Sequence, residues 1–408
     1  MGPVPLSLPL AVLLLLCTDP AVSAGEDEYT WPQRKMPLVH EKQTVRLSVS
    51  GFTAERQSEL NGTCGIECQS EFPEPSVELL QEMLSYETMY ENGTRTLTSV
   101  TLQGLEITAE NVSSSSRSRS KREVYGTDTR FTISDKQYSM KYPFSTAVKI
   151  STGCTGVLVS PKHVLTAAHC IHDGTDYIKG AEKLSVGVLR DKKKGGKKRR
   201  GKGRKEEGEK EKVETESEGK KQERKSKGRK GRSKRSAPSG KPTFRWTRVK
   251  KTQIPKGWFK GISDSAEADY DYAVLELKKG QKGQHMELGI IPSVKKLPAS
   301  RIHFSGFDDD RPGNLVYRFC SVSDESNDLM YQQCDAKPGA SGAGVYVRLK
   351  EAGKRKWKRK VIGVFTGHQW VQVNGQQQDY NVAVRITPVK FAQICSWVHG
   401  DSSMCQNT

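Results

Sequence analysis

Two short apolar runs that lead directly into a histidine constrain the fold of this chain most strongly. Residues 155–159 and 164–165 are largely apolar and lie on either side of a Ser-Pro-Lys turn, a pattern that predicts two short buried strands. His169 and Cys170 follow almost at once. A histidine that acts as a general base must sit on a rigid element, and its partner groups come from elsewhere in the fold. Taken alone, the segment could equally hold a structural histidine beside a cysteine.

Two later segments contain side chains that could act with this histidine. Asp271 precedes a small residue and an apolar, strand-like run at residues 273–277. Ser341 lies in Pro-Gly-Ala-Ser-Gly-Ala-Gly, where glycines allow the tight backbone that exposes a nucleophilic hydroxyl and aims two N–H groups at an oxyanion. Taken singly, Asp271 could be a turn residue and Ser341 part of a common glycine-serine loop. Asp269 is a rival carboxylate beside Asp271.

Together these segments resemble the chymotrypsin-like serine proteases. The similarity is carried by Gly-Cys-Thr-Gly at 153–156, Leu-Thr-Ala-Ala-His-Cys at 165–170, Asp-Tyr-Ala-Val-Leu-Glu-Leu at 271–277 and Gly-Ala-Ser-Gly at 339–342. The resemblance implies an all-β fold of two six-stranded antiparallel barrels with a C-terminal helix. It also implies a catalytic triad of His169, Asp271 and Ser341, and an oxyanion hole formed by the backbone N–H groups of Gly339 and Ser341.

The chain departs from that family at its activation site. Most trypsin-like members have an aspartate just before the serine, which pairs with the ammonium of a newly cleaved apolar N-terminus. Here that position is Ala340, and the expected mature chain begins at Glu123. Both partners of the usual ion pair are missing, so we expect no zymogen switch of that type. The stretch at 125–130 instead resembles the mature start of glutamyl-endopeptidase-like members.

The resemblance also indicates three candidate specificity residues. Asp335 lies six residues before Ser341, where trypsin-like enzymes place the carboxylate that selects Arg or Lys. Thr366 occupies the place where a serine usually lines the substrate cleft. His368 could favour an acidic substrate side chain, as a histidine does in the glutamyl-endopeptidase-like branch. A structural role is the alternative for Asp335 and His368.

Over its length the chain resembles a vertebrate branch of the family, the serine protease 23 and serine protease 35 pair. The shared motifs include Gly-Ile-Glu-Cys at 65–68, Tyr-Gly-Thr-Asp at 125–128 and Gly-His-Gln-Trp-Val at 367–371. The long basic insert makes the chain more similar to the serine protease 35 side. Some sequences of that group carry threonine at the nucleophile and are regarded as inactive, whereas this chain carries Ser341.

The first residues and the cysteines indicate a secreted, extracellular protein. Residues 1–24 have the short apolar core and small-residue cleavage site of a signal peptide, and no stretch is long enough to span a bilayer.

The cysteine count favours disulfides. Of nine cysteines, eight remain after removal of the signal peptide, and an even number in an exported chain favours disulfides. The family resemblance supports Cys154–Cys170, and Cys320–Cys334 is similarly expected. The pairing of four others stays open, between two local bridges and bridges from prosegment to protease domain: Cys64, Cys68, Cys395 and Cys405. No metal or cofactor is expected, and zinc at 64–68 is a weak alternative because no histidine lies nearby.

Residues 25–122 have the composition of a separate, glycosylated prosegment. From residue 25 to 116 there are 15 acidic and six basic residues, so an acidic prosegment could dock on a basic partner. Three Asn-x-Ser/Thr acceptors occur here, at Asn61, Asn92 and Asn111. The segment ends in Arg-Ser-Lys-Arg at Arg122, a site for a furin-like convertase or, more plainly, a charged spacer.

A basic insert at 190–235 interrupts the domain that spans 123–408. It contains 23 basic and nine acidic residues, which supply +14 of the chain's net charge of +19, and no aromatic residue. Such a segment cannot bury enough apolar surface to order itself. We expect it to bind an extracellular polyanion such as heparan sulfate, with a solvated loop as the alternative and nucleic acid disfavoured because no aromatic residues interleave the charges. It ends at Arg235 in a second convertase-like site.

These observations predict a secreted serine endopeptidase that acts on a protein or peptide substrate. A different class of protein also fits them: a catalytically inactive, glycosaminoglycan-binding scaffold that keeps the protease fold. Ala340, the altered cleft and the insert favour this second hypothesis.

Overall fold

The computed structural model describes residues 2, 30–48, 51–55, 75–105, 127–190, 243–260, 268–373 and 376–405. Several predicted features lie outside these residues: the signal peptide, Asn61, Asn111, Cys64, Cys68, Arg122, nearly all of the basic insert, and Arg235. Among the described residues, no helix has the length and apolar character that a bilayer crossing requires.

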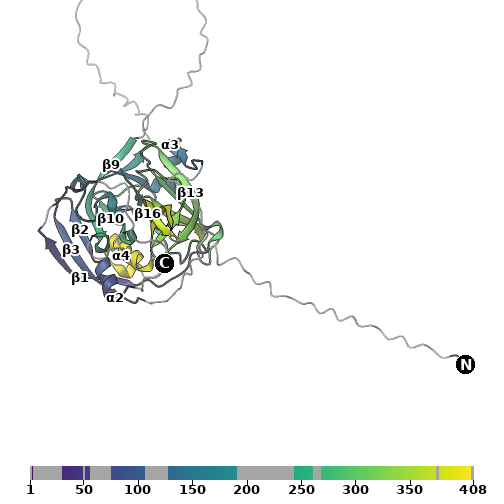
Figure 1. Ribbon diagram of the computed structural model, residues 1–408, viewed down its shortest axis with the longest axis horizontal. Coiled ribbons are helices and arrows are strands. Elements are labelled where there is room, and N and C mark those ends of the chain that lie inside the picture. Colours follow the sequence, from purple (N-terminus) through teal and green to yellow (C-terminus); the bar gives the residue numbers. More distant parts are fainter. Residues whose placement is uncertain are drawn as a thin grey trace, which may run out of the picture.

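Six antiparallel strands close the first barrel (Figure 1). They are β5 (Ala147–Ile150), β6 (Thr155–Leu158), β7 (His163–Thr166), β8 (Ser185–Arg190), β9 (Thr243–Pro255) and β10 (Ala273–Leu277). The predicted apolar runs form β6 and β7, and every residue of β6 is buried. The pairing of β8 with β9 closes the barrel, and Arg190 lies opposite Thr243. The insert therefore joins two adjacent strand ends, so its length is compatible with an intact barrel.

A second barrel of six strands follows in the chain. It consists of β12 (Arg301–Gly306), β13 (Leu315–Glu325), β14 (Leu329–Gln332), β15 (Gly344–Lys350), β16 (Trp357–Val373) and β17 (Gln376–Arg385), and the pairing of β16 with β17 closes it. Two short strands attach to it, β4 (Phe131–Ile133) on β13 and β11 (Glu287–Leu288) on β16. Its core is aliphatic and aromatic, with Phe304 and Phe365 stacked at a centroid distance of 4.8 Å.

The C-terminal helix α4 (Pro388–His399) packs on the first barrel. Thr387 caps its N-terminus with proline at the first helical position, and Gly400 ends it in the left-handed conformation at φ +75°. Cys395 forms a disulfide with Cys405, so this pair is local, one of the two arrangements left open above. The other helices among the described residues are short: α2 (Val77–Leu84), α3 (Lys136–Ser139), and the single 3₁₀ turns η2 (Phe144–Thr146), η3 (Ala168–Cys170), η4 (Ala181–Lys183), η5 (Lys256–Trp258), η6 (Ala268–Tyr270), η7 (Pro298–Ser300) and η8 (Ser402–Cys405). The all-β prediction with a terminal helix is confirmed.

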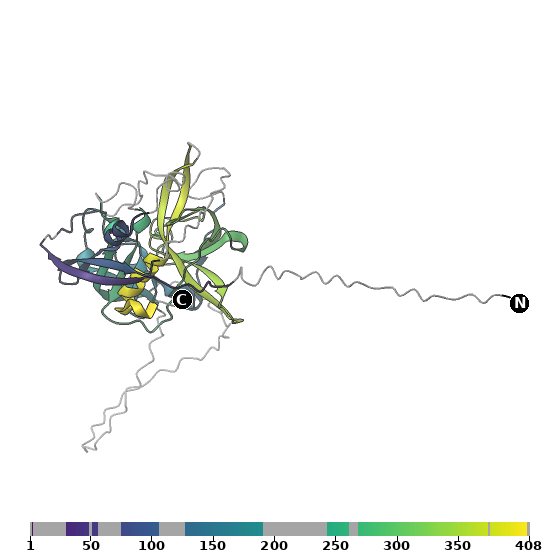
Figure 2. The ribbon, with the colours of Figure 1, turned by 90° about the horizontal axis from the view of Figure 1, so that it is seen from below.

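The described part of the prosegment is not separate from this body. Its strands β1 (Leu38–Leu47), β2 (Tyr86–Tyr90) and β3 (Arg95–Gln103) extend the first sheet to nine strands, because β2 pairs antiparallel with β9. Figures 1 and 2 show these purple and blue strands lying against the first barrel. The acidic composition predicted an electrostatic contact with a basic partner, and Glu55, Glu82 and Glu91 do form ion pairs with Lys179, Lys256 and Lys278. Strand pairing and apolar burial, which the composition did not predict, add to these ion pairs.

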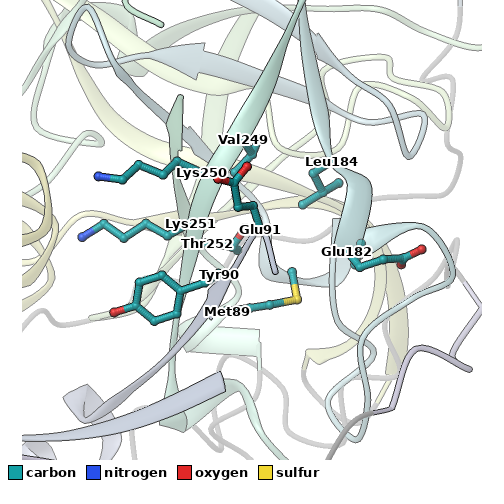
Figure 3. A pocket seen from close by; sticks show the side chains of 10 residues that line it. Met89, Tyr90, Glu91, Glu182, Leu184, Val249, Lys250, Lys251 and Thr252 are labelled. Atoms are coloured by element: carbon teal, nitrogen blue, oxygen red, sulfur yellow. The ribbon is translucent and has the colours of Figure 1, made fainter. Parts of the chain in front are cut away.

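Packing at this junction is tight. Tyr86 and Met89 are each 3% exposed, and burying a side chain of this kind contributes about 1.5–3 kcal/mol. Figure 3 shows Met89 and its neighbours against Val249 and Leu184, around a cavity of only about 10 Å³, which has room for one water at most. Trp31 also enters the second barrel's core, and its indole N–H donates to the Lys358 carbonyl at 3.2 Å. The prosegment is therefore part of both barrels' packing.

Candidate active site

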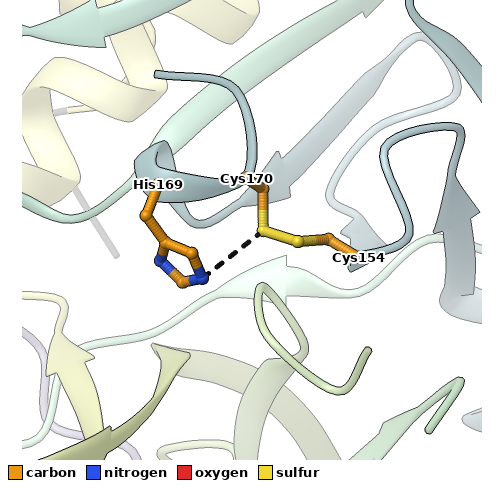
Figure 4. Close-up of side chains that lie close together, drawn as sticks. All are labelled: Cys154, His169 and Cys170. Carbon is orange, nitrogen blue, oxygen red and sulfur yellow. Dashed lines mark hydrogen bonds between the residues drawn. A yellow bond between two sulfur atoms is a disulfide. The ribbon is translucent and has the colours of Figure 1, made fainter. Parts of the chain in front are cut away.

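The first barrel holds His169 in a rigid position. Strand β7 runs directly into η3, which contains His169 between two fully buried residues. A disulfide joins Cys170 to Cys154, the residue before β6, and ties this turn to the barrel (Figure 4). The side chain of His169 is 4% exposed.

Asp271 holds this histidine at two atoms. Its Oδ1 accepts the backbone N–H of His169 at 2.8 Å, and its Oδ2 lies 2.7 Å from the ring Nδ1. Strand β10 begins two residues later and pairs with β7, with Ala273 opposite Thr166, so the sheet itself brings the two together. The contact with Asp271 fixes the ring's orientation and places the Nδ1 proton on the side of the carboxylate.

Asp269, the rival carboxylate, makes no contact with His169. Burial, with Asp328 nearby, raises the pKa of Asp269 well above its usual value. It lies in η6 on the side of Lys390 and Asp328, and the partner of His169 is therefore Asp271.

Ser341 sits in a loop that the first barrel anchors. The backbone N–H of Thr155 donates to the Ser341 carbonyl at 2.8 Å, and the Thr155 hydroxyl donates to the Gly339 carbonyl at 2.7 Å. Gly339 and Gly342 have φ of +100° and +83°, which favour glycine. A Cβ on Gly342 would collide with the Thr155 carbonyl and the Thr166 hydroxyl, so this loop packs directly against the strands that lead to His169.

Two backbone donors at this loop have no partner within the described residues. The N–H groups of Ala340 and Gly342 donate to the carbonyls of Lys337 and Phe365. The N–H groups of Gly339 and Ser341, the residues on either side of Ala340, make no hydrogen bond to any described residue. Nearly all buried backbone donors in proteins are satisfied, so a pair of unpaired ones beside a serine has the character of an anion site.

No hydrogen bond joins His169 to Ser341 among the described residues. Among the described residues Ser341 Oγ makes no hydrogen bond, and His169 Nε2 lies 3.8 Å from Cys170 Sγ (Figure 4). Cys154, His169 and Cys170 lie close enough to suggest a metal site. Both sulfurs are consumed by the disulfide, however, so neither offers the thiolate that zinc requires.

Asp335 binds Thr129, near the start of the described part of the protease domain. Its Oδ2 accepts both the backbone N–H and the hydroxyl of Thr129, each at 2.7 Å, and the residue is 1% exposed. The family resemblance suggested Asp335 as a residue that selects Arg or Lys, with a structural role as the alternative. The structure instead gives its carboxylate a buried structural partner, which agrees with the structural alternative.

Arg130, the next residue, enters a buried charge network. Its guanidinium lies 2.9 Å from Asp308, 2.9 Å from Asp128 and 2.7 Å from Asp310, and its side chain is 3% exposed. Arg318 also pairs with Asp308 at 2.5 Å, with both side chains fully buried. The hydrogen bond from Arg130 lowers the pKa of Asp128 to about 2. Thr129 and Arg130 are thus fixed by their own side chains.

This network adjoins the nucleophile loop. Asp309 donates its backbone N–H to the Pro338 carbonyl at 2.7 Å, and Phe307 donates to the Thr155 hydroxyl at 2.9 Å. A Cβ on Gly339 would lie 2.5 Å from the Phe307 carbonyl oxygen. Residues on both sides of Asp308 therefore hold the loop that carries Ser341. Sequence reasoning missed Arg130 and Asp308, because Phe-Asp-Asp-Asp-Arg at 307–311 has the composition of an exposed loop.

The other two specificity candidates lie on β16. Between them is Gly367, at which a Cβ would lie 3.8 Å from Ser341 Oγ, so the strand passes beside the nucleophile. Thr366 is 2% exposed and donates to the Val382 carbonyl at 3.0 Å. The His368 ring lies against the carboxylate of the buried Asp379. Both side chains are therefore engaged by neighbouring β17.

Comparison with known proteins agrees with this geometry. The family described as Trypsin matches residues 132–215. Inactive serine protease 35 of Homo sapiens is 58% identical over 390 residues, which cover 94% of each chain, and serine protease 23 of Bos taurus is 49% identical over 400 residues, which cover 98% of each. A solved structure of Glu endopeptidase in complex with MPD matches with a TM-score of 0.43 and 17% identity, over 67% of this chain and 98% of that one. The chain therefore belongs to the trypsin-like serine protease family, in the branch that contains serine protease 35 and serine protease 23.

Proposed function

We propose that this chain is a serine endopeptidase in which Ser341 is the nucleophile. His169 would take the hydroxyl proton as Ser341 attacks a peptide carbonyl, and would then give that proton to the leaving amine. Asp271 would stabilise the imidazolium that forms in between. Water would attack the resulting acyl-enzyme in the same way and regenerate the hydroxyl.

The observation that carries this proposal is the pair of unpartnered N–H groups on Gly339 and Ser341 beside a histidine held twice by Asp271. An oxyanion that develops on the substrate would accept from both N–H groups. Removing one such donor typically costs about 3–4 kcal/mol of transition-state stabilisation. Two buried backbone donors without a described partner would otherwise be an unexplained cost in this loop.

We further propose that the loop is ordered without a new N-terminus. Arg130 and Asp308 would take over the role that the ammonium–aspartate pair has in other family members, since Ala340 is buried and apolar. Cleavage at Arg122 by a furin-like convertase would then be a trimming step and not the switch that forms the oxyanion site.

The second candidate is a catalytically inactive scaffold. The missing hydrogen bond between His169 and Ser341 favours it. Some relatives carry the name inactive serine protease 35, whereas others are named serine protease 23. In this proposal the secreted, glycosylated chain would bind heparan sulfate through residues 190–235. Asn92 supports an exposed acceptor site, because it lies exposed in the turn between β2 and β3.

A fluorophosphonate probe separates the two candidates. We expect the chain trimmed at Arg122 to be labelled, Ser341→Ala to remain unlabelled, and His169→Ala to react far more slowly. Ser145→Ala, a serine outside the site, is the matched control and should be labelled like the parent chain. A trimmed preparation that unfolds cooperatively yet stays unlabelled would establish the scaffold.

A further inference from the structure

The hairpin formed by β15 and β16 places like charges directly opposite each other. In its register Arg348 faces Arg359, and Lys350 faces Trp357. Like charges in this position destabilise an antiparallel pair. Among the described residues, none of these three cations has a carboxylate within ion-pair distance. The face is therefore electrostatically unfavourable in the free protein.

On the opposite face of the same hairpin, the cationic side chain is paired with carboxylates. Side chains alternate between faces along a strand, so Lys358 points away from Arg359. Lys358 pairs with Glu287, and Glu351 lies 3.3 Å from its Nζ. Carboxylates are thus available to the hairpin, yet they neutralise only the face that lacks the Arg348–Arg359 pair.

An exposed tryptophan orients the unpaired cations. Trp357 is 40% exposed, with the Arg348 guanidinium carbon 5.2 Å and the Lys350 ammonium 5.7 Å from its ring centroid. Contacts of this kind favour cations over the ring while leaving their N–H groups toward solvent. Because the ring already carries two cations, it is not an open platform on which a nucleic-acid base could stack.

A pocket of about 410 Å³ continues from these side chains. Arg348 and Arg359 line it together with Lys141, and the Arg359 guanidinium lies 5.9 Å from the Tyr142 ring centroid. The other lining residues are aromatic or proline, and none is acidic: Tyr138, Pro143, Phe144, His303, Tyr317 and Tyr346. Burial, with Arg301 and Arg359 nearby, lowers the pKa of His303 to about 4, so the histidine is neutral at physiological pH.

We propose that this cationic aromatic face, formed by Arg348, Lys350, Trp357 and Arg359 with the adjoining pocket, binds a sulfated polysaccharide. Arginine forks can donate two hydrogen bonds to the tetrahedrally arranged oxygens of a sulfate group, and the tyrosine-lined pocket offers apolar rings and hydroxyls to a sugar. The site lies on the second barrel and involves no residue of the 190–235 insert. It would also bind the chain to sulfated glycans whether or not Ser341 is catalytic.

Lysine footprinting in the full chain tests the site directly. We expect heparin oligosaccharide to slow acetylation of Lys350 and Lys141, read by mass spectrometry, and to leave Lys162 and Lys279 unchanged. These two controls are exposed lysines of the first barrel. Full reactivity of Lys350 at saturating heparin would overturn the proposal, even if lysines of the insert were protected. Equal protection by single-stranded DNA of the same charge would overturn the glycan assignment.

A charge-matched pair of variants adds a second measurement. Arg348→Gln/Arg359→Gln should lower heparin affinity about tenfold at about 0.15 M salt and abolish the protection of Lys350, while the insert stays protected. Lys162→Gln/Lys279→Gln removes the same charge and should change affinity far less. An equal loss of heparin affinity in both double variants would show that only net charge matters, and would refute a defined binding site. Because the two arginines repel each other, replacing them should not lower the melting temperature. If the melting temperature does fall, the Lys350 footprint of the unmutated chain decides whether heparin binds at this site.

Discussion

Replacing Arg130 with methionine tests whether buried charges order the mature segment. Methionine keeps most of the length of the side chain and removes the guanidinium that contacts Asp308, Asp128 and Asp310. Asp308 is fully buried and would keep only Arg318 as a partner. The change therefore leaves the network with one uncompensated negative charge.

The loss of unfolding free energy expected for Arg130→Met depends on how deeply each carboxylate is buried. Removing one partner of a buried pair typically destabilises a protein by about 3–5 kcal/mol. Because Arg318 remains on Asp308, we expect the lower end, about 3 kcal/mol. Asp128 and Asp310 are 34% and 40% exposed and can rehydrate, so their lost contacts add little.

Urea and thermal unfolding of the full chain measure this cost. A loss of about 3 kcal/mol corresponds to a fall in melting temperature of about 6–12 °C for a domain of this size. Arg311→Met is the matched control, because Arg311 pairs with the same Asp128 but its side chain is 23% exposed. The control should lose less than about 1 kcal/mol.

The same variant reports on the nucleophile loop. If the network orders the loop through Asp309 and Phe307, fluorophosphonate labelling of Ser341 should fall in Arg130→Met even at temperatures where the protein stays folded. Equal destabilisation by Arg130→Met and Arg311→Met would refute the argument from burial. Normal labelling in a destabilised Arg130→Met would separate the network from the loop.

Three further predictions follow from the same contacts. Since the pKa of Asp128 is lowered to about 2, its stabilising contribution is complete above about pH 4 and is lost as the pH falls toward 2; acid unfolding of Arg130→Met should lack this component. Gly339→Ala, at φ +100° and 2.5 Å from the Phe307 carbonyl, should suppress probe labelling, whereas Gly353→Ala, also at positive φ but in open space, should not. Cleavage at Arg122 should leave the N-terminal fragment bound through gel filtration in native buffer, and its separation without denaturant would contradict the shared sheet.

The sequence was sufficient for contacts that are local or carried by motifs. The apolar runs before His169 predicted β6 and β7, and the resemblance to trypsin-like proteases placed Asp271 beside the histidine, 102 residues away. The two protease-domain disulfides expected from the sequence are both present, Cys154–Cys170 and Cys320–Cys334.

Contacts without a motif were not predictable. Thr129 reaches Asp335 across 206 residues and Arg130 reaches Asp308 across 178, and nothing in the local pattern of either segment indicates its partner. The pairing of β2 with β9 was not predicted, for a related reason. A net acidic composition indicates how a segment interacts with solvent and with charged partners. It does not indicate which strand of the segment pairs with the edge of a sheet.

The two halves of the triad depend on different parts of the fold, and this bears on the question of activity. The contact between Asp271 and His169 follows from the pairing of β10 with β7 in the first barrel. The contact between His169 and Ser341 depends on the nucleophile loop, which Thr155 holds from one barrel and residues 307–309 hold from the other. Small differences in barrel packing can therefore open or close the second contact without disturbing the first. Activity and inactivity within one family then require no change of fold, only a shift in a loop that both barrels support.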